Sequence, residues 1–362
     1  MDEIRVLMVL SNLRKSNGVS SFAMNYYNRL DHDKIHVDFA IYQVQDNPYD
    51  ETIKQNGSTI FLLPSVKHYA QHKAACEKIL HDGRYNIIHD NTLMLSLPLM
   101  KAAKKYVPVR ILHSHNSKLG ETAAREIRNK ITIPVLRQTA TNYAACSKLA
   151  AKAMFGDANY KFIPNIIDSV LFKYSAENRD KVRKEFRVDN KFVVGTVGRP
   201  SEQKNPFFAI DVIEEAAKTI DNLEYWWIGS GPLDNDLYDY IQKKGLSDKV
   251  KLLGTRMDIP DLYQAMDCFF LPSLFEGLPV TAIEAQAMGL PCLISDTVTR
   301  ELVYTDLVQY ISLDNKEEWI QALRDVSNRN DRTGRSQDLL SSQFADVNAG
   351  EFLEAYYRSL LG

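Results

Sequence analysis

Two carboxylates stand on either side of a segment that is typical of the start of a helix. In chain order the segment contains Glu276, Gly277, Leu278, Pro279 and, further along, Glu284. The apolar residues 268–271 before it predict a buried parallel strand. Pro279 suits the first position of the helix that follows, where its missing N–H costs nothing. We therefore expect Glu276 and the next two amides to lie at the carboxyl end of a strand.

This arrangement predicts binding of a sugar nucleotide. A helix N-terminus attracts an anion such as phosphate, and the carboxylates of Glu276 and Glu284 would accept hydrogen bonds from sugar hydroxyls. Taken alone, the segment is better interpreted as a capped helix with a surface glutamate. The segments below favour the nucleotide.

Two cations follow the strand expected at residues 192–197. Gly198 lets the backbone turn, Arg199 and Lys204 lie in the loop, and Asn205 is suited to cap the next helix. The cations therefore flank a helix start, where a diphosphate would receive charge-assisted hydrogen bonds of roughly 1.5–3 kcal/mol each. Alone, the pair would be ordinary surface residues, but the glutamate segment downstream favours a phosphate site.

Two more strand-to-helix loops in the second half suit a nucleotide. The loop at residues 228–233 contains Gly229 and Gly231 but lacks the third glycine of a dinucleotide fingerprint, so it is a weak signal for NAD. It is a reasonable second wall for a phosphate or a base. The following loop carries Arg256, which we expect to reach a nucleobase.

The first loop of the chain, residues 11–21, joins a predicted strand to a helix. Gly18 and the amides after it would face a phosphate at the helix N-terminus. No Gly-Lys-Ser or Gly-Lys-Thr sequence follows, so the loop is not a Walker motif. A purely structural turn is the alternative.

Two histidines close the strand expected at residues 109–113. His113 and His115 are two residues apart, so their side chains share one face of the strand. A metal site is disfavoured because no Cys, Asp or Glu partner lies beside them. Binding of sugar hydroxyls is the better interpretation, and a core histidine is the alternative.

The elements that must position these residues alternate between strand and helix along nearly the whole chain. The predicted strands lie at residues 5–10, 36–41, 59–62, 87–89, 109–113, 143–145, 161–163, 192–197, 225–228, 250–252, 268–271, 291–294 and 308–310. This alternation predicts the α/β class, with two Rossmann-like, doubly wound parallel sheets. Ligands bind beyond the carboxyl ends of such strands, so we expect the sheets to face an interdomain cleft.

We expect two domains and a terminal helix with an apolar face. A Pro-Asn turn at residues 164–165 predicts a boundary that divides the chain into domains at 1–168 and 169–344. A helix at about 345–362 carries aromatic residues at helical spacing, so it needs a surface to cover. A chain of 362 residues is also too long for one core.

The composition is that of an ordinary globular protein, with 45% hydrophobic and 25% charged residues. No stretch is apolar enough to span a membrane, and the N-terminus lacks a signal pattern. The four cysteines are scattered and predict buried thiols in a reducing cytoplasm. The Asp-x-Asp sequences at Asp31 and Asp234 lie in a polar loop and at a helix start, so we expect no metal requirement.

The net charge of −2 is unevenly distributed. Residues 1–168 hold 22 Lys and Arg against 15 Asp and Glu, whereas residues 169–362 hold 22 against 31. Residues 101–161 hold 12 basic and 3 acidic side chains. This region could face anionic lipid at the inner face of the cell membrane or a diphosphate-bearing acceptor; a solvated surface is the alternative. Nucleic acid is disfavoured because no aromatic-interleaved basic platform accompanies the charge.

Taken in order, these motifs resemble those of family-4 retaining glycosyltransferases, particularly bacterial enzymes of exopolysaccharide and capsule assembly. The motifs are Asn17-Gly18-Val19, His113-Ser-His115-Asn, Pro164-Asn165-Ile-Ile-Asp168, Gly198-Arg199 with Lys204-Asn205, Gly229-Ser-Gly231-Pro-Leu, and Glu276-Gly-Leu-Pro with Glu284-Ala. The resemblance covers nearly the whole chain. It implies the GT-B fold, with the last helix crossing back onto the first domain. Asn17 departs from the family's pair of glycines in the first loop.

The resemblance also implies a role for each domain and its residues. A nucleotide-diphosphate sugar, with UDP as the nucleotide, would bind the second domain, and the acceptor would bind the first. Arg199 and Lys204 would hold the diphosphate, and Glu284 the ribose. Glu276 and the amides after it would contact the donor sugar.

For the first domain the resemblance implies contacts near the reacting atoms. His115 would bind the transferred sugar near its anomeric centre, with His113 as the second candidate, and Gly18 would approach the phosphate. The reaction would need no metal or other cofactor. It would proceed with retention, the leaving phosphate assisting deprotonation of the acceptor.

The leading hypothesis is transfer of a hexose or N-acetylhexosamine to a lipid-linked oligosaccharide in surface polysaccharide biosynthesis. One alternative is a UDP-N-acetylhexosamine epimerase of the same architecture, which would change the donor without any acceptor. Another is a non-catalytic subunit that binds a nucleotide sugar and supports a partner enzyme.

Overall fold

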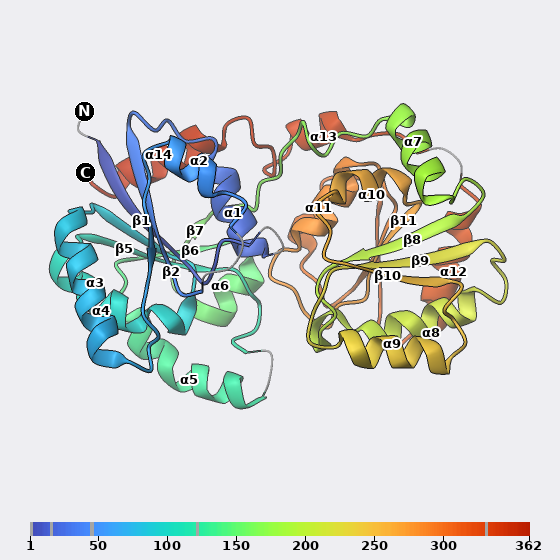
Figure 1. Ribbon diagram of the computed structural model, residues 1–362, viewed down its shortest axis with the longest axis horizontal. Helices are drawn as coiled ribbons and strands as arrows, with labels where there is room; N and C mark the ends of the chain where they lie inside the picture. Colours follow the sequence, from blue (N-terminus) through green and yellow to red (C-terminus); the bar gives the residue numbers. More distant parts are fainter. Residues whose placement is uncertain (1–2, 15–16, 44–46, 121–122, 330–331) are drawn as a thin grey trace. The chain divides into compact units, whose positions relative to one another are not determined.

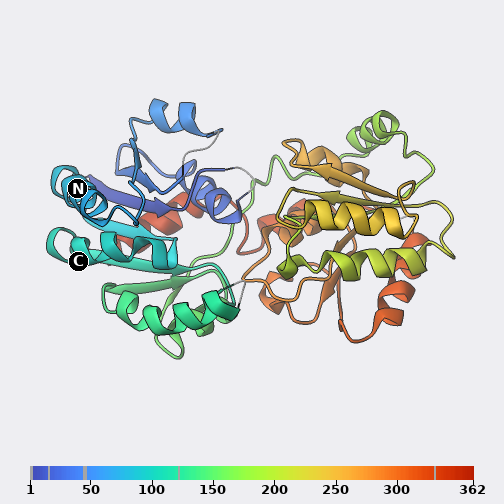
Figure 2. The same ribbon diagram turned by 60° about the horizontal axis from the view of Figure 1, so that its bottom comes forward.

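Two units, each built on one parallel sheet, make up the chain. The computed structural model describes residues 3–14, 17–43, 47–120, 123–329 and 332–362. Unit 1 comprises Met1–Ile166 with Asp346–Gly362, and unit 2 comprises Ile167–Ala345. Helices cover both faces of each sheet (Figures 1 and 2). The α/β class with two parallel sheets is therefore confirmed.

The sheet of unit 1 has seven strands in the order β3-β2-β1-β4-β5-β6-β7. They are β1 (Ile4–Leu10), β2 (Ile35–Ile41), β3 (Ile60–Leu62), β4 (Ile87–Asp90), β5 (Val109–Ser114), β6 (Asn142–Ala145) and β7 (Lys161–Phe162). All of these neighbours pair in parallel, so the carboxyl ends of the strands meet at one edge. His89 pairs in register with Ile111. His89 and His113 therefore share one face of the sheet.

Helices of unit 1 include one from the far end of the chain. They are α1 (Gly18–Tyr27), α2 (Asp50–Gln55), α3 (Tyr69–Gly83), η1 (Leu93–Ser96), α4 (Leu97–Tyr106), α5 (Ala123–Arg137), α6 (Lys148–Phe155) and α14 (Ala349–Ser359). Leu353 and Tyr357 of α14 belong to the core of unit 1. A Cβ at Gly350 would meet Arg29 O at 1.8 Å, so glycine permits this close approach.

The sheet of unit 2 has six strands in the order β10-β9-β8-β11-β12-β13. They are β8 (Phe192–Val197), β9 (Leu223–Ile228), β10 (Val250–Gly254), β11 (Cys268–Leu271), β12 (Cys292–Ser295) and β13 (Val308–Ile311). All pair in parallel. The helices are α7 (Ala176–Phe186), η2 (Glu202–Lys204), α8 (Pro206–Ala216), α9 (Asp234–Lys243), α10 (Ile259–Ala265), α11 (Val280–Ala287), η3 (Arg300–Leu302), α12 (Lys316–Ser327) and α13 (Ser336–Leu340).

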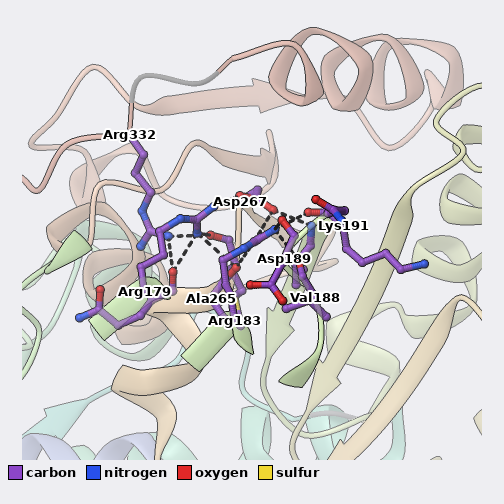
Figure 3. Close-up of polar contacts among 12 residues, drawn as sticks. Arg179, Arg183, Val188, Asp189, Lys191, Ala265, Asp267 and Arg332 are labelled. Carbon is purple, nitrogen blue, oxygen red and sulfur yellow. Dashed lines mark hydrogen bonds and ion pairs between the residues drawn. The ribbon is translucent and has the colours of Figure 1, made fainter. Parts of the chain in front are cut away.

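Three arginines donate hydrogen bonds to the backbone carbonyl groups at the carboxyl end of α10, which lies at the amino edge of this sheet (Figure 3). Arg179 and Arg183 of α7, together with Arg332, donate hydrogen bonds to carbonyl oxygens at or just beyond the end of α10. Arg179 and Arg183 also pair with the Asp267 carboxylate. A helix C-terminus leaves such carbonyls unsatisfied. Burial lowers the pKa of Arg332 to about 9, which still leaves it charged at neutral pH.

The helices of the described residues are of ordinary length. α3 and α5 have 15 residues each. Within the described ranges, no helix is at once long and apolar enough to cross a bilayer.

Candidate functional site

The loops after three neighbouring strands of unit 2 interlock at the carboxyl edge of its sheet. These strands are β10, β9 and β8. Gly229 N donates to Gly254 O at 2.8 Å, and Trp227 Nε1 donates to Gly198 O at 2.9 Å. A Cβ at Gly229 would meet Gly198 O at 2.4 Å, and its φ of +137° also favours glycine. The expected Gly198, Gly229 and Arg256 loops therefore do lie at one edge.

An ion pair joins two of the predicted site residues at this edge. Lys204 Nζ lies 2.7 Å from Glu276 Oε1, and the two side chains are 14% and 8% exposed. Gln203 Nε2 donates to Phe275 O at 3.0 Å and to Glu276 Oε2 at 3.2 Å. Leu274 N donates to Gln203 O at 2.8 Å. Because β8 and β11 are neighbours, the segments that follow them form one continuous wall.

The first residues of α11 and α8, the helices that follow this wall, differ slightly from the prediction. α11 begins at Val280, so Pro279 is the residue before the first helical one, in an extended conformation. Its φ of −70° is the value that the proline ring imposes, and it suits both positions. Asn205 precedes α8 as expected but makes no side-chain cap hydrogen bond. Its left-handed backbone (φ 53°) differs from the extended conformation that a capping residue adopts.

Gly277 and Leu278 are buried beside Glu276. Two hydroxyl oxygens of the same segment, Ser273 Oγ and Thr281 Oγ1, are buried without a hydrogen-bond partner among the described residues. Buried polar atoms are nearly always paired. The segment 273–281 therefore holds hydrogen-bonding capacity that the described residues do not use.

Glu284 lies on α11 and is only partly exposed. The Tyr263 hydroxyl lies 3.0 Å from Glu284 Oε2 and 3.0 Å from Thr281 O. Burial raises the pKa of Glu284 to about 7, although the Tyr263 hydrogen bond acts in the opposite direction. A ligand hydroxyl that donates to this carboxylate would favour its ionised form.

Arg256 and Arg199 occupy the loops on either side of the β9 loop. Arg256 makes a two-point pair with Asp258, with Nε–Oδ1 at 2.8 Å and Nη2–Oδ2 at 2.5 Å. These hydrogen bonds raise the pKa of Arg256. Its guanidinium also lies 5.7 Å from the centre of the Phe186 ring. Arg199 is exposed directly after Gly198.

Unit 1 has its own line of polar side chains at the carboxyl ends of β4 and β5. Tyr357 Oη lies 2.8 Å from His89 Nδ1, and His89 Nε2 lies 2.9 Å from His113 Nδ1. The His113 ring stacks on that of His115, with centroids 4.0 Å apart and planes at 27°. His113 and His115 thus share one face, as the strand alternation predicted.

His115 is the accessible member of this line. His113 is fully buried, whereas His115 is partly exposed. His115 Nε2 lies 2.8 Å from Asn91 Oδ1. Burial lowers the pKa of His115 to about 3, and the pKa of His113 well below its usual value. Both imidazoles are therefore neutral at pH 7, and His115 is the better placed to meet a ligand.

Gly18 opens α1 and is exposed. A Cβ there would touch nothing within 4 Å. The side chain of Asn17 caps the helix, because its Oδ1 accepts from Val19 N at 2.9 Å and from Ser20 N at 3.4 Å. We expected the amides of Val19 and Ser20 to face a phosphate, but both already donate to the Asn17 side chain. The prediction of a phosphate-facing amide in this loop is therefore limited to Gly18.

A hollow of about 610 Å³ lies at the opposite, amino edge of the sheet of unit 2. It is lined in part by Arg179, Arg183, Arg332 and Asp267. The hydrogen bonds of these arginines already go to carbonyl oxygens and to Asp267 (Figure 3). In parallel sheets, ligands bind at the carboxyl edge, so the size of this hollow does not mark the active site.

Comparison with known proteins identifies the family. Residues 178–335 match the family described as glycosyl transferases group 1. This stretch contains the Lys204–Glu276 pair and Glu284. EpsF of Bacillus subtilis, which is named as a glycosyltransferase, is 30% identical over 311 residues, covering 82% of this chain and 80% of EpsF. The chain belongs to the group 1 glycosyl transferases.

Two further proteins are similar to this glycosyltransferase. An Escherichia coli enzyme, UDP-Gal:alpha-D-GlcNAc-diphosphoundecaprenol alpha-1,3-galactosyltransferase, is 32% identical over 235 residues, 60% of each chain. The crystal structure of Anabaena HepE in complex with UDP and glucose superposes with a TM-score of 0.83 at 19% identity, covering 99% of this chain and 100% of HepE. The expected GT-B architecture is thereby confirmed.

The sequence patterns do not single out three residues that belong to the polar line around His113 and His115 in this glycosyltransferase. His89 and Asn91 follow a predicted strand, so the rule that ligands gather at carboxyl ends could have singled them out. Tyr357 is 268 residues from His89, and no local pattern connects them. The direct pairing of Lys204 with Glu276 was likewise not foreseen, although both were expected in one pocket.

Proposed function

We propose that this glycosyltransferase transfers a hexose or N-acetylhexosamine from a UDP-sugar to a lipid-linked oligosaccharide in surface polysaccharide biosynthesis. The observation that carries the proposal is the Lys204–Glu276 pair at the start of α11, beside the interlocked glycine loops. The E. coli relative supports the choice of substrates, because its name specifies UDP-Gal and a diphosphoundecaprenol-linked acceptor. Unit 2 would bind the donor and unit 1 the acceptor.

The donor is held by charge at one end and by carboxylates at the other. Arg199 and Lys204 neutralise the diphosphate, and the N-terminus of α11 adds amide dipoles. Glu284 accepts hydrogen bonds from the ribose hydroxyls. Such groups are already in place when negative charge develops on the leaving nucleotide, which is the main way that they accelerate the reaction.

Transfer proceeds with retention, and Glu276 acts as a positioning group rather than as a covalent nucleophile. Its Oε1 lies beside Lys204 and its Oε2 accepts from Gln203, so both carboxylate oxygens are held in place by neighbouring side chains. The acceptor hydroxyl attacks from the side of the departing diphosphate. Its proton passes to a phosphate oxygen as the bond to the sugar forms. His115 binds a hydroxyl of the transferred sugar.

The reaction needs no metal or other cofactor, since Arg199 and Lys204 supply the positive charge that a divalent ion would otherwise provide. Among the described residues there is no group of three or more His, Cys, Asp or Glu side chains suited to hold a metal ion. Transfer in the presence of EDTA tests this directly. An absolute requirement for added Mg²⁺ or Mn²⁺ would overturn it.

The reaction takes place in the cytoplasm, at the inner face of the membrane that carries the acceptor. The excess of basic residues at 101–161 supports peripheral contact with anionic lipid.

A panel of UDP-, GDP- and ADP-sugars in a thermal-shift assay tests the donor, because a true donor stabilises the folded protein by mass action. Transfer to a diphosphoundecaprenol-linked saccharide then tests the reaction. Incubation with donor alone followed by sugar analysis reveals an epimerase. Binding without any turnover by purified protein would instead indicate a non-catalytic subunit.

A further inference from the structure

Helix α5 of unit 1 exposes three apolar side chains along one face. Ile127, Ile131 and Val135 are 62%, 71% and 41% exposed. Their spacing of four residues places them in one stripe along the helix. The opposite face is the one that packs on the unit, through Asn129, Ile133 and Leu136. The apolar stripe is therefore separate from the side of α5 that packs against the core.

Basic side chains border this stripe on both sides. At about 100° per residue, Arg128 lies on one flank and Lys130 on the other, with Arg137 near Lys130. Within residues 126–137 the only acidic side chain is Glu126, whose Oε1 lies 3.0 Å from Lys130 Nζ. α5 is labelled below the sheet of unit 1 in Figure 1.

We propose that the outer face of α5 docks on an anionic membrane surface. A helix with an apolar stripe between rows of Lys and Arg lies in the plane of a bilayer interface, with the apolar side chains among the acyl chains. The long basic side chains reach outward to lipid headgroups. This surface gives the proposed function its partner, but the contact itself does not depend on turnover.

Charge decides between lipid and a second copy of the chain. A symmetric dimer through this face would place the same patch of each copy against the other. Each copy would bring three basic side chains and one acidic side chain of residues 126–137 to the interface, and this net like charge opposes association. An anionic lipid surface complements the cations and accepts the isoleucines at once.

The experiment is flotation of the purified full chain with vesicles. One set is phosphatidylcholine alone, and another contains about 30% phosphatidylglycerol. We expect binding to the anionic vesicles that weakens as salt rises. Ile127→Gln with Ile131→Gln should lower the partition coefficient about tenfold. Arg128→Gln with Lys130→Gln should lower binding to anionic vesicles and reduce its salt dependence.

Matched controls alter similar side chains elsewhere. Val170 is 81% exposed, so Val170→Gln removes an exposed aliphatic side chain from unit 2 and should leave flotation unchanged. The thermal shift produced by the UDP-sugar should be the same in every variant. If the UDP-sugar produced no thermal shift in the wild-type chain, the proposed function would be contradicted, but the proposed membrane contact would not be.

Three outcomes would overturn the membrane contact. One is equal flotation with neutral and anionic vesicles. Another is flotation that is the same for the wild-type chain and for the stripe variant, which carries Ile127→Gln and Ile131→Gln. The third is a dimer, detected by light scattering, that the stripe variant converts to a monomer, because the stripe would then be an interface between copies.

Discussion

Asn91 Oδ1 lies 2.8 Å from His115 Nε2, and the surroundings of Asn91 fix which way its amide points. Its Nδ2 donates to His89 O at 3.1 Å and to Val9 O at 3.3 Å. A turned amide would set its oxygen against these two carbonyl oxygens. His115 Nε2 must therefore carry the proton, which leaves Nδ1 as an acceptor. This tautomer leaves Nδ1 available to accept the sugar hydroxyl that the proposed function assigns to His115.

Replacing Asn91 should release this tautomer without removing the histidine. Asn91→Leu should lower kcat/KM for transfer roughly tenfold, the effect of about 1.4 kcal/mol or one hydrogen bond. ¹⁵N NMR should show the His115 ring shifting from one tautomer to a mixture. The matched control is Asn56→Leu, which removes another Asn–His pair, with His32, and should leave transfer unchanged. An unaltered His115 spectrum in Asn91→Leu would refute the assignment.

Stability and catalysis at Lys204 should be separable. Lys204→Met leaves the mostly buried Glu276 carboxylate without its cation, so the free energy of unfolding should fall by about 3 kcal/mol. In Lys204→Met with Glu276→Gln the unpaired charge is gone, and stability should largely recover. Transfer should stay about 10²–10³-fold below wild type in both variants.

Urea unfolding and steady-state kinetics measure the two effects. Lys54→Met breaks an exposed pair with Asp50, so it should change stability little. Full recovery of transfer in the double variant would show that Lys204 serves only to neutralise Glu276.

Donor binding should release a proton near neutral pH. The pKa of Glu284 is raised to about 7 by burial, so the free carboxyl is about half protonated there. Ribose hydroxyls that donate to it favour the ionised form, so affinity for a UDP-sugar should weaken as pH falls below 7, up to about tenfold per pH unit. Calorimetry in buffers of different ionisation enthalpy measures the released proton. Glu284→Gln should abolish the release; its persistence would place the titrating group elsewhere.

Unit 1 should lose stability in mild acid. Burial lowers the pKa of His89 to about 3 and that of His113 well below its usual value. The unfolded chain binds protons at both below about pH 6.5, whereas the folded chain does not. Stability is therefore lost as pH falls from about 6.5, by about 1.4 kcal/mol per pH unit for each histidine.

Unfolding free energies between pH 7 and 5 check this slope. His113→Phe removes one of the buried imidazoles, so the slope should become shallower by about 1.4 kcal/mol per unit. His81 is an exposed histidine, with 74% of its side chain accessible, and His81→Gln is the control for replacing a histidine outside this buried pair. An equal slope in His113→Phe would contradict the neutral, buried state of this ring.

Much of the fold could be predicted because its signals are local. Strands such as 192–197 and 268–271 are short apolar runs, and strand–helix alternation implies parallel sheets. The rule that ligands bind at the carboxyl ends of parallel strands then predicts that Arg199, Lys204, Glu276 and Glu284 lie at one edge of a sheet. Helix starts were less certain by a residue, as at Pro279, because several backbone conformations accept the same local sequence.

Local sequence patterns are enough to predict the α/β class, the two sheets and the loops that carry polar residues, since periodicity and turn chemistry act over a few neighbouring residues. Which side chains meet depends on the tertiary structure. Lys204 reaches Glu276 because β8 lies beside β11 in the sheet, and Tyr357 reaches His89 because α14 returns to unit 1. It also decided that Ile131 is exposed while Ile133 is buried. Such contacts join distant segments through sheet order and packing, which no local pattern encodes.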